Sequence, residues 1–357
     1  MKDPRRVNQG NYKHPLVDIL FLVISAAVSG ADTWQSIVLF GKNQLHWLQK
    51  FFPYQDGIPS PDTLERVFAV LDFQEFSMYF TEWISEVCKL SEGEVIPIDG
   101  KSMRGSADKA NGKKFIHMVS AFASENGVCL GQVVCKEKSN EITAIPELLE
   151  LLAIKGCIVT IDAMGCQTKI ATKIRSKKAD YILAVKQNQD ELYRQVNKLF
   201  SVTGASSVDV DDDFGHGRIE RRKCTVINDL RFLDGKEKWK DISSVIKIES
   251  ERYNKSSGKA QSETRLYISS LNKDAKVLNS KIRKHWAIEN NLHWLLDVAF
   301  SEDDSRKRKG NSAKNFNLIA KVALNLIIKE NTQKVSKKNK RFKAALDTEY
   351  REKILQV

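Results

Sequence analysis

The sequence has little that would tie it to a membrane, a secretory route or a disulfide scaffold. Its 6 cysteines include no CxxC pair and stand mostly among apolar residues, which is typical of reduced cysteines in a cytosolic protein core. The longest apolar stretch, residues 19–28, is about half of a membrane span. No cleavable secretory pattern opens the chain. We therefore expect a cytoplasmic protein without a membrane segment.

The motifs of several common enzyme classes are also missing. No Walker loop and no GxGxxG motif follows an expected strand, so nucleotide hydrolysis and dinucleotide redox chemistry have no support. The 6 histidines show neither an HExxH motif nor a zinc spacing with cysteine. Metal sites built from soft ligands are therefore disfavoured.

Positive charge is what the sequence has in quantity. Its 357 residues are 42% hydrophobic and 29% charged, an ordinary composition for a globular protein of two or three domains. Lys and Arg number 57 against 45 Asp and Glu, and the net charge of +12 favours polyanionic partners. Residues 273–357 hold 20 Lys and Arg against 10 Asp and Glu. A solvated basic helix and tail would carry the same charge, so charge alone leaves nucleic-acid binding one of two alternatives.

Hydrophobic periodicity divides the chain into five parts. Helical spacing predicts a helical N-terminal module over residues 1–92. Strands and helices then follow as β-β-β-α-β-α-β-α over 93–200, which predicts an α/β domain with a mixed sheet and helices on both faces. We expect a β-rich insertion over 201–263, a return to the α/β domain with a long helix over 264–330, and a basic C-terminal tail over 331–357.

Two aspartates follow strand-like runs. Asp99 ends one apolar run and precedes Gly100, and Asp162 ends another and precedes Ala163. Ligands bind outside the carboxyl ends of the strands in an open α/β sheet, so we expect both carboxylates at that edge. A single aspartate in such a place more often caps a turn or a helix, but the same arrangement at two strands favours a site.

A third carboxylate, Glu289, lies in a helix expected over residues 279–299. At helical spacing it shares a face with Trp286 and Leu296, where an ionised side chain is costly unless it is paired or binds a metal. The alternative is a structural network in which Glu289 meets Arg283 or a buried histidine.

Three carboxylates around one small volume would repel one another, and a divalent cation would relieve that repulsion. Mg²⁺ or Mn²⁺ takes oxygen ligands, and two such ions about 3.5–4 Å apart can activate water and stabilise the leaving oxygen at a phosphodiester. This chemistry suits a basic protein that binds nucleic-acid backbone. For His285 and His293, eight residues apart, we expect helix packing or DNA contact rather than metal ligation.

Five short blocks follow one another along the chain: residues 99–101, 104–106, 138–142, 161–167 and 285–304. In this combination they resemble the DDE transposases of bacterial insertion sequences, in the branch that includes the H-repeat-associated proteins. The resemblance runs from about residue 12 to residue 329. It implies a ribonuclease-H-like catalytic domain whose metal-binding triad is Asp99, Asp162 and Glu289. His285 and Leu296 stand where related transposases carry an Arg and a Lys near this Glu.

The resemblance implies a transposase that binds the terminal inverted repeats of its element, cleaves DNA strands with two Mg²⁺ or Mn²⁺ ions, and transfers them to target DNA. The implied partners are double-stranded DNA and a second copy of the chain in a synaptic homodimer, at the bacterial nucleoid. A catalytically silent DNA-binding repressor of the element and a structure-specific nuclease of the same fold are the alternatives. The residues expected to contact DNA are Lys101, Arg104, Lys186, Arg218, His285, His293 and Arg306.

Overall fold

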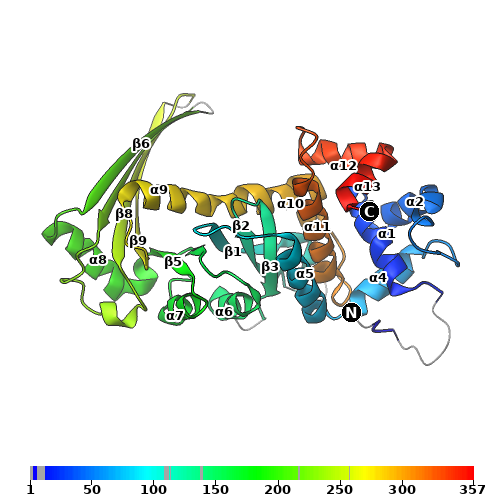
Figure 1. The fold of residues 1–357 in the computed structure, drawn as a ribbon, viewed down its shortest axis with the longest axis horizontal. Helices are drawn as coiled ribbons and strands as arrows, with labels where there is room; N and C mark the ends of the chain where they lie inside the picture. Colours follow the sequence, from blue (N-terminus) through cyan, green and yellow to red (C-terminus); the bar gives the residue numbers. More distant parts are fainter. Residues whose placement is uncertain are drawn as a thin grey trace.

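The computed structural model describes residues 3–5, 13–107, 112, 114–136, 140–215, 218–256 and 258–357. Figure 1 shows an elongated molecule with a helical body at one end, a sheet flanked by helices in the middle and a long β arm at the other end. Both chain termini lie at the helical body.

One sheet of nine strands runs through the described part of the chain, in the order β3-β2-β1-β4-β5-β9-β8-β7-β6. Strands β1, β4 and β5 are parallel to one another, and the other neighbouring pairs are antiparallel. The mixed sheet expected from the sequence is therefore present. The strands are β1 (Val95–Met103), β2 (Ile116–Ala123), β3 (Val128–Val134), β4 (Ile158–Ile161), β5 (Asp180–Val185), β6 (Ser207–Gly215), β7 (Arg218–Ile227), β8 (Ser244–Asn254) and β9 (Lys259–Ser269).

Helices cover both faces of this sheet. Successive residues of a strand point to opposite faces, and β4 shows the result: Val159 belongs to the core under one set of helices, and Ile158 to the core under another. The first core includes residues of α6 (Glu141–Leu151), α7 (Thr168–Ser176) and α8 (Asp190–Val202), and the second includes residues of α9 (Ala275–Arg283). The prediction of helices on both faces is confirmed.

The β-rich insertion forms the arm, and it contains a strand that the sequence did not predict. Strand β6 carries the acidic run Asp211–Asp213, and aspartate is depleted in strands. The ladder compensates for this, because Asp212 lies opposite Arg221 and Arg283 of α9 pairs with both Asp211 and Asp213. The second hairpin, β8–β9, extends past residue 263, so the expected end of the insertion falls inside β9.

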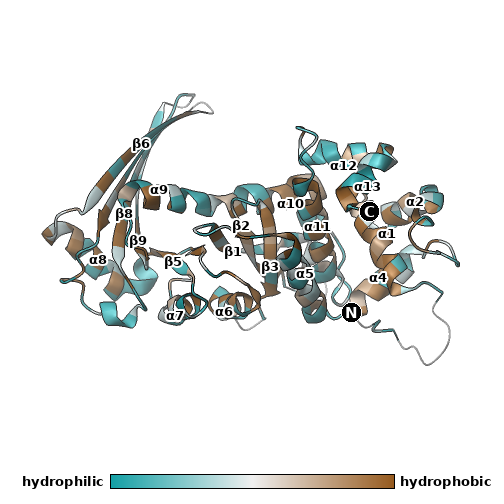
Figure 2. Cartoon of the chain, viewed as in Figure 1, coloured by the Kyte–Doolittle hydropathy of each residue, from teal (hydrophilic) through white to brown (hydrophobic). Residues whose placement is uncertain are grey.

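The helical body joins the two ends of the chain around one apolar core. Figure 2 shows α1 as largely hydrophobic and α12 as largely hydrophilic. The apolar helix α1 is therefore wrapped by other helices rather than by lipid, and no helix in the described ranges has the length and apolar character that a membrane crossing requires. The body comprises α1 (Leu16–Val28), α2 (Trp34–Asn43), α3 (Leu45–Leu48), α4 (Pro61–Val70), α5 (Phe73–Val87), α10 (Trp294–Phe300), α11 (Ser312–Lys329), α12 (Lys337–Leu346) and α13 (Thr348–Leu355).

The C-terminal segment differs from the expected basic tail. Residues 331–357 include α12 and α13, which pack against α1 and α11. Lys340, Arg341 and Arg351 are buried there, and Arg341 donates to the carbonyl oxygen of Ala27 and pairs with Asp32. These cations cap and bridge helices of the body. Sequence composition cannot distinguish such buried cations from those of a solvated tail.

Candidate active site

The pairing of β1 with β4 brings Asp99 and Asp162 to one edge of the sheet. Ile98 and Ile161 are partners in this parallel pair, and an aspartate follows each of them. Asp162 comes directly after the end of β4, whereas β1 continues past Asp99 to Met103, paired with β2. Adjacent strands are about 4.8 Å apart, so the two carboxylates leave the sheet side by side. Asp162 Oδ1 also accepts hydrogen bonds from the backbone N–H groups of Met164 (3.1 Å) and Gly165 (3.4 Å). The alternative turn-capping role is thus present as well, and it fixes the orientation of the Asp162 carboxylate.

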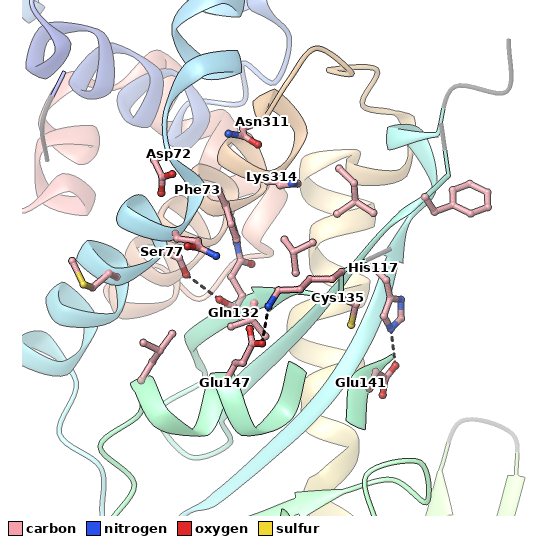
Figure 3. Close-up of a pocket in the computed structure, with 18 of the residues that line it drawn as sticks. Asp72, Phe73, Ser77, His117, Gln132, Cys135, Glu141, Glu147, Asn311 and Lys314 are labelled. Atoms are coloured by element: carbon pink, nitrogen blue, oxygen red, sulfur yellow. Dashed lines mark hydrogen bonds and ion pairs between the residues drawn. The ribbon is translucent and has the colours of Figure 1, made fainter. Parts of the chain in front are cut away.

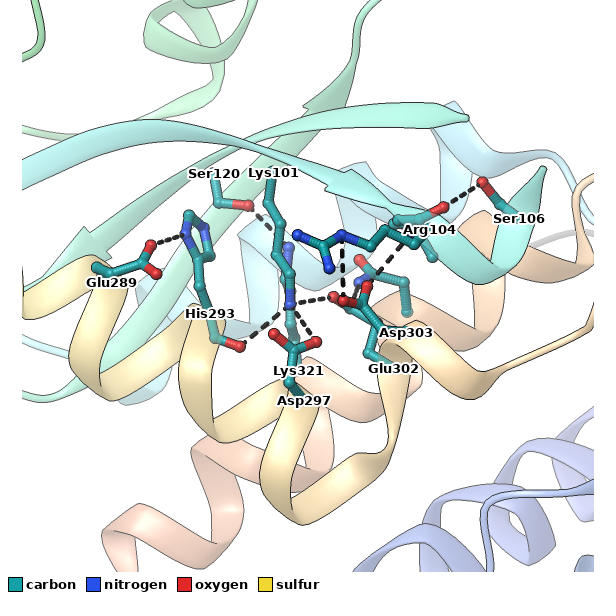
Figure 4. A network of polar contacts seen from close by, with 12 residues as sticks. Lys101, Arg104, Ser106, Ser120, Glu289, His293, Asp297, Glu302, Asp303 and Lys321 are labelled. Atoms are coloured by element: carbon teal, nitrogen blue, oxygen red, sulfur yellow. Dashed lines mark hydrogen bonds and ion pairs between the residues drawn. The ribbon is translucent and has the colours of Figure 1, made fainter. Parts of the chain in front are cut away.

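The helix expected over residues 279–299 is interrupted where Glu289 lies. After α9 come a 3₁₀ turn, Lys284–Trp286, and a π-helical segment, Glu289–His293, before α10 begins. Single π-helical turns are found frequently at functional sites. Within this segment, His293 Nδ1 lies 3.1 Å from Glu289 Oε2 (Figure 4). The same nitrogen lies 3.6 Å from Asp99 Oδ2.

These three side chains form a candidate metal centre. One ligand atom each from Asp99, Glu289 and His293 lies within 4.8 Å of the other two. His293 is buried, and its Nε2 has no hydrogen-bond partner among the described residues. Sequence reasoning expected packing or DNA contact for His293, and it missed that a histidine four residues after Glu289 could reach the same point.

The surroundings of Glu289 are more open than expected. Its side chain is 54% exposed, and Trp286 is 41% exposed, so the prediction of a carboxylate enclosed by large apolar residues was wrong. The alternative of a buried histidine partner is observed in His293, whereas Arg283 pairs with the arm instead. Glu289 is therefore free to meet a ligand that approaches from solvent.

Burial and mutual repulsion control the ionisation of the site. Burial, together with the charges of Glu141, Asp162 and Glu289, raises the pKa of Asp99 to about 7 against the opposing effect of a hydrogen bond from Gly100. Loss of solvation also raises the pKa of Asp162, with Glu141 as the next contributor. Burial, assisted by nearby cations, lowers the pKa of His293 to about 3, so its ring is neutral at physiological pH. A neutral imidazole beside carboxylates that repel one another is a set of donors suited to a divalent cation.

The sequence patterns gave no role to Glu141, although this residue lies in the block over residues 138–142. Glu141 is the first residue of α6, and its Oε1 lies 2.7 Å from His117 Nε2 (Figure 3). A cavity of about 1110 Å³ lies between α5, β3 and α6, and both residues line it. The sequence pattern over residues 93–200 gave no signal that Glu141 lies beside the strand of Asp99.

Lys101 joins the strand of Asp99 to the helix of Glu289. Its Nζ lies 2.6 Å from Asp297 Oδ1 and 2.7 Å from Glu302 Oε2, and it donates to the carbonyl oxygen of His293 at 3.1 Å (Figure 4). Burial opposes its charge, but Glu302 and Asp297 raise the pKa of Lys101 above its ordinary value. Only 15% of the side chain is exposed, so this expected DNA contact is committed to internal ion pairs.

The other expected DNA contacts are divided between surface and interior. Arg104, Lys186 and Arg306 are exposed, and Lys186 is close enough to Asp162 to lower its pKa slightly. His285 is turned inward, with Nδ1 at 3.0 Å from Thr160 Oγ1, and burial lowers its pKa to about 4. Arg218 is the first residue of β7, and its side chain lies outside the described part of the structure.

A mixed sheet with one aspartate inside a strand, a second directly after the parallel neighbouring strand, and a glutamate on the helical segment beside them is the arrangement expected of a DDE-type DNA transposase. The chain belongs to the family described as "Transposase DDE domain", whose model matches residues 90–326. A second model, described as "DDE_Tnp_1-associated", matches residues 1–84. The expected family is confirmed, and so is the expected fold class of a mixed sheet with helices on both faces.

Two bacterial relatives extend this result to nearly the whole chain. The "Putative transposase YncI" of Escherichia coli O157:H7 is 47% identical over 97% of this chain and 90% of its own length. The "H repeat-associated putative transposase YhhI" of Escherichia coli strain K12 is 38% identical over 96% of this chain and 93% of its own length. A piggyBac transposase synaptic complex with hairpin DNA aligns with 12% identity and a TM-score of 0.46 over 99% of this chain and 76% of that one.

Proposed function

We propose that this transposase binds the terminal inverted repeats of an insertion sequence, cleaves DNA at the ends of the element and joins the freed strand to target DNA. The observation that carries the proposal is the convergence of Asp99, Glu289 and His293 beside Asp162 at the sheet edge. Neighbouring carboxylates help to raise the pKa of Asp99 and of Asp162, and such crowding of negative charge favours a site that binds cations.

Asp99, Asp162 and Glu289 would hold two Mg²⁺ or Mn²⁺ ions. When bound, such ions activate water and stabilise the leaving oxygen of a phosphodiester. The protein residues set the geometry: backbone N–H groups orient Asp162, and the neutral His293 ring orients Glu289. His293 is a further candidate ligand, and Mn²⁺ accepts a nitrogen ligand more readily than Mg²⁺ does.

DNA would lie along the exposed cations near this edge. Arg104, Lys186 and Arg306 are accessible and suit phosphate contacts, which position DNA without reading its sequence. Because two ends of an element must be cut, we infer a homodimer that holds both ends in a synaptic complex. The substrate would be chromosomal DNA, so the site of action would be the bacterial nucleoid in the cytoplasm.

Two alternatives share this fold. A catalytically silent repressor of the element would bind its ends without cutting, and the complete set of carboxylates argues against it. A structure-specific nuclease would cut without recognising ends or joining strands. Matched inverted repeats just outside the open reading frame would favour the mobile-element function over the nuclease.

Single substitutions at the three carboxylates test the proposal. We expect Asp99→Ala, Asp162→Ala and Glu289→Ala each to abolish nicking of labelled element ends in Mn²⁺ and to retain DNA binding, because Lys and Arg supply the affinity for phosphate. Nicking and gel-shift affinity are measured on the same preparations. Glu86→Ala, at an exposed position of α5, is the control and should cut normally. Normal cleavage by a folded triad variant would remove that residue from the site.

A further inference from the structure

Glu141 lies beside the three carboxylates but belongs to a different element. It begins α6, whose N-cap Asn140 accepts a hydrogen bond from Ile142 N at 3.1 Å. Only 13% of the Glu141 side chain is exposed. A carboxylate in the first turn of a helix is favoured by the helix dipole.

His117 of β2 fixes the orientation of this carboxylate. The ring is held at both nitrogens, with Nδ1 at 3.0 Å from Ser102 Oγ and Nε2 at 2.7 Å from Glu141 Oε1. Ser102 and His117 are also partners in the β1–β2 ladder. The hydrogen bond that the His117 ring donates to Glu141 raises the pKa of His117 despite its partial burial. One oxygen of Glu141 is thus anchored to the sheet, and no hydrogen bond within the described residues reaches the other, Oε2.

The Glu141 carboxylate lies directly against the backbone next to Asp99. A Cβ atom on Gly100 would overlap Glu141 Oε1 and would lie 2.5 Å from His117 Nε2. A residue with a side chain at position 100 would therefore displace Glu141. The charge of Glu141 is also among the causes that raise the pKa of both Asp99 and Asp162.

We propose that Glu141 is a fourth carboxylate of the metal site, which uses its free oxygen to hold the second cation together with Asp162, and that His117 is the positioning residue that orients it. This inference rests on the proposed function, since it adds a ligand to the site of Asp99, Asp162 and Glu289. It gives a role to a partly buried glutamate whose charge acts on both Asp99 and Asp162. An isolated pair between His117 and Glu141 would contribute little stability at this exposure.

Binding of Mn²⁺ to the full-length, DNA-free protein tests the proposal directly. Titration with MnCl₂, followed by the electron paramagnetic resonance of free Mn²⁺ and by calorimetry, gives the number of ions and their affinities. We expect two ions in the wild type, and a second-site dissociation constant at least ~100-fold higher in Glu141→Gln, the upper end of losses seen on removing partners of metal ligands. His117→Gln should weaken the same ion by about 10-fold.

Glu147→Gln is the matched control. Glu147 lies on the same helix, is about half exposed and pairs with Lys136 at 3.1 Å, so its substitution should leave both ions unchanged. Gly100→Ala keeps every carboxylate but displaces Glu141, and it should reproduce the loss of the second ion alone. If Glu141→Gln fails to fold, Glu141→Asp keeps the charge, shortens the side chain by one methylene and should show the same selective loss.

The possible outcomes separate the two proposals. Two ions bound with wild-type affinity by folded Glu141→Gln or Glu141→Asp would overturn the role of Glu141 and leave the proposed function standing. A wild-type protein that binds no Mn²⁺, or an Asp162→Asn variant that binds two ions normally, would overturn the proposed metal site and the role of Glu141 with it.

Discussion

Lys101 shows how one side chain can change role between sequence and structure. It stands two residues after Asp99, in a block that suggests phosphate contact, yet its ammonium group bridges β1 to the segment that follows Glu289. The distance between the two catalytic elements therefore depends on this cation. Glu302, its most buried partner, would be left as an unpaired charge without it.

We expect Lys101→Met to lower the free energy of unfolding by about 3 kcal/mol, because breaking a buried ion pair leaves its partner charge uncompensated. Urea denaturation followed by circular dichroism measures this change. Arg104→Met is the control: Arg104 is 79% exposed and 3.7 Å from Asp303, and such pairs contribute less than about 1 kcal/mol. Equal stability of the Lys101 and Arg104 variants would rule out the bridging role.

Lys307 is a second buried cation. It donates to the carbonyl oxygen of Asp32, and its Nζ lies 3.6 Å from the centre of the Phe316 ring. Burial lowers the pKa of Lys307 to about 8, against a smaller opposing effect of Asp32. Between pH 8 and the ordinary lysine pKa of about 10.5, the unfolded chain keeps a proton that the folded chain has lost.

The contribution of Lys307 to the free energy of unfolding should therefore increase as the pH rises from 8 to about 10.5. Below pH 8 both the folded and the unfolded chain hold the proton, and this gain should be absent. Relative to Lys307→Met, the wild-type free energy of unfolding is expected to rise by up to about 3 kcal/mol over this range. Paired urea titrations of the two proteins at several pH values measure the difference. A difference that stays constant across the range would contradict the depressed pKa.

At the scale of elements, the π-helical segment sets how Glu289 is rotated relative to the helices on either side of it. An ordinary α-helix through this region would advance by 3.6 residues per turn, and the extra residue of the π turn changes the relative rotation of the two helices it joins. The helix α9 is held by the sheet and α10 by the helical body. The rotation of Glu289 toward Asp99 thus depends on the length of this segment.

Deletion of Asn291, an exposed residue of the π segment, should restore α-helical geometry and turn Glu289 by about 100° relative to α10. We expect loss of nicking and of Mn²⁺ binding, with the helical content by circular dichroism unchanged. Asn291→Ala retains the length of the segment and should behave like the wild type. Cleavage by the deletion variant at the wild-type rate would show that the π turn does not set the position of Glu289.

At the scale of the whole molecule, the distribution of charge differs from what the sequence suggested. The C-terminal quarter carries most of the net charge, but Lys307, Lys321, Lys340, Arg341 and Arg351 are buried. Lys321, for example, donates to Ser120 Oγ at 2.8 Å beneath the sheet. The cations available to DNA are therefore fewer than the composition implies.

Salt dependence of DNA binding distinguishes the two kinds of cation. Each phosphate neutralised on duplex DNA adds about 0.9 to the slope of log affinity against log salt concentration. We expect Arg306→Gln with Lys309→Gln, two exposed positions, to flatten this slope by up to about 2. The buried Lys307→Met should leave it unchanged. A flatter slope for Lys307→Met alone would mean that this residue reaches DNA after all.

Much of the fold could be predicted from local patterns. The alternation of apolar runs and turns indicated the strands around Asp99 and Asp162, and the two acids were expected at one edge because parallel neighbouring strands end on the same side. Strand β6 escaped prediction because its aspartates oppose strand formation locally and are stabilised only by Arg221 and by Arg283 from α9. These stabilising partners lie at a distance in the sequence, so a local pattern does not include them.

The candidate site shows the same difference between what local sequence patterns predict and what contacts between distant residues decide. Asp99, Asp162 and Glu289 are candidates that the sequence alone provides, since acids that follow apolar runs and an acid in an apolar-looking helix are local signals. The tertiary structure alone brought in His293 and Glu141 and committed Lys101 to internal pairs. These roles depend on how α6, α10 and β2 pack against β1. Whether a charged side chain faces solvent, a partner or a metal is decided by desolvation and by the groups that packing brings near it, and no local pattern contains either.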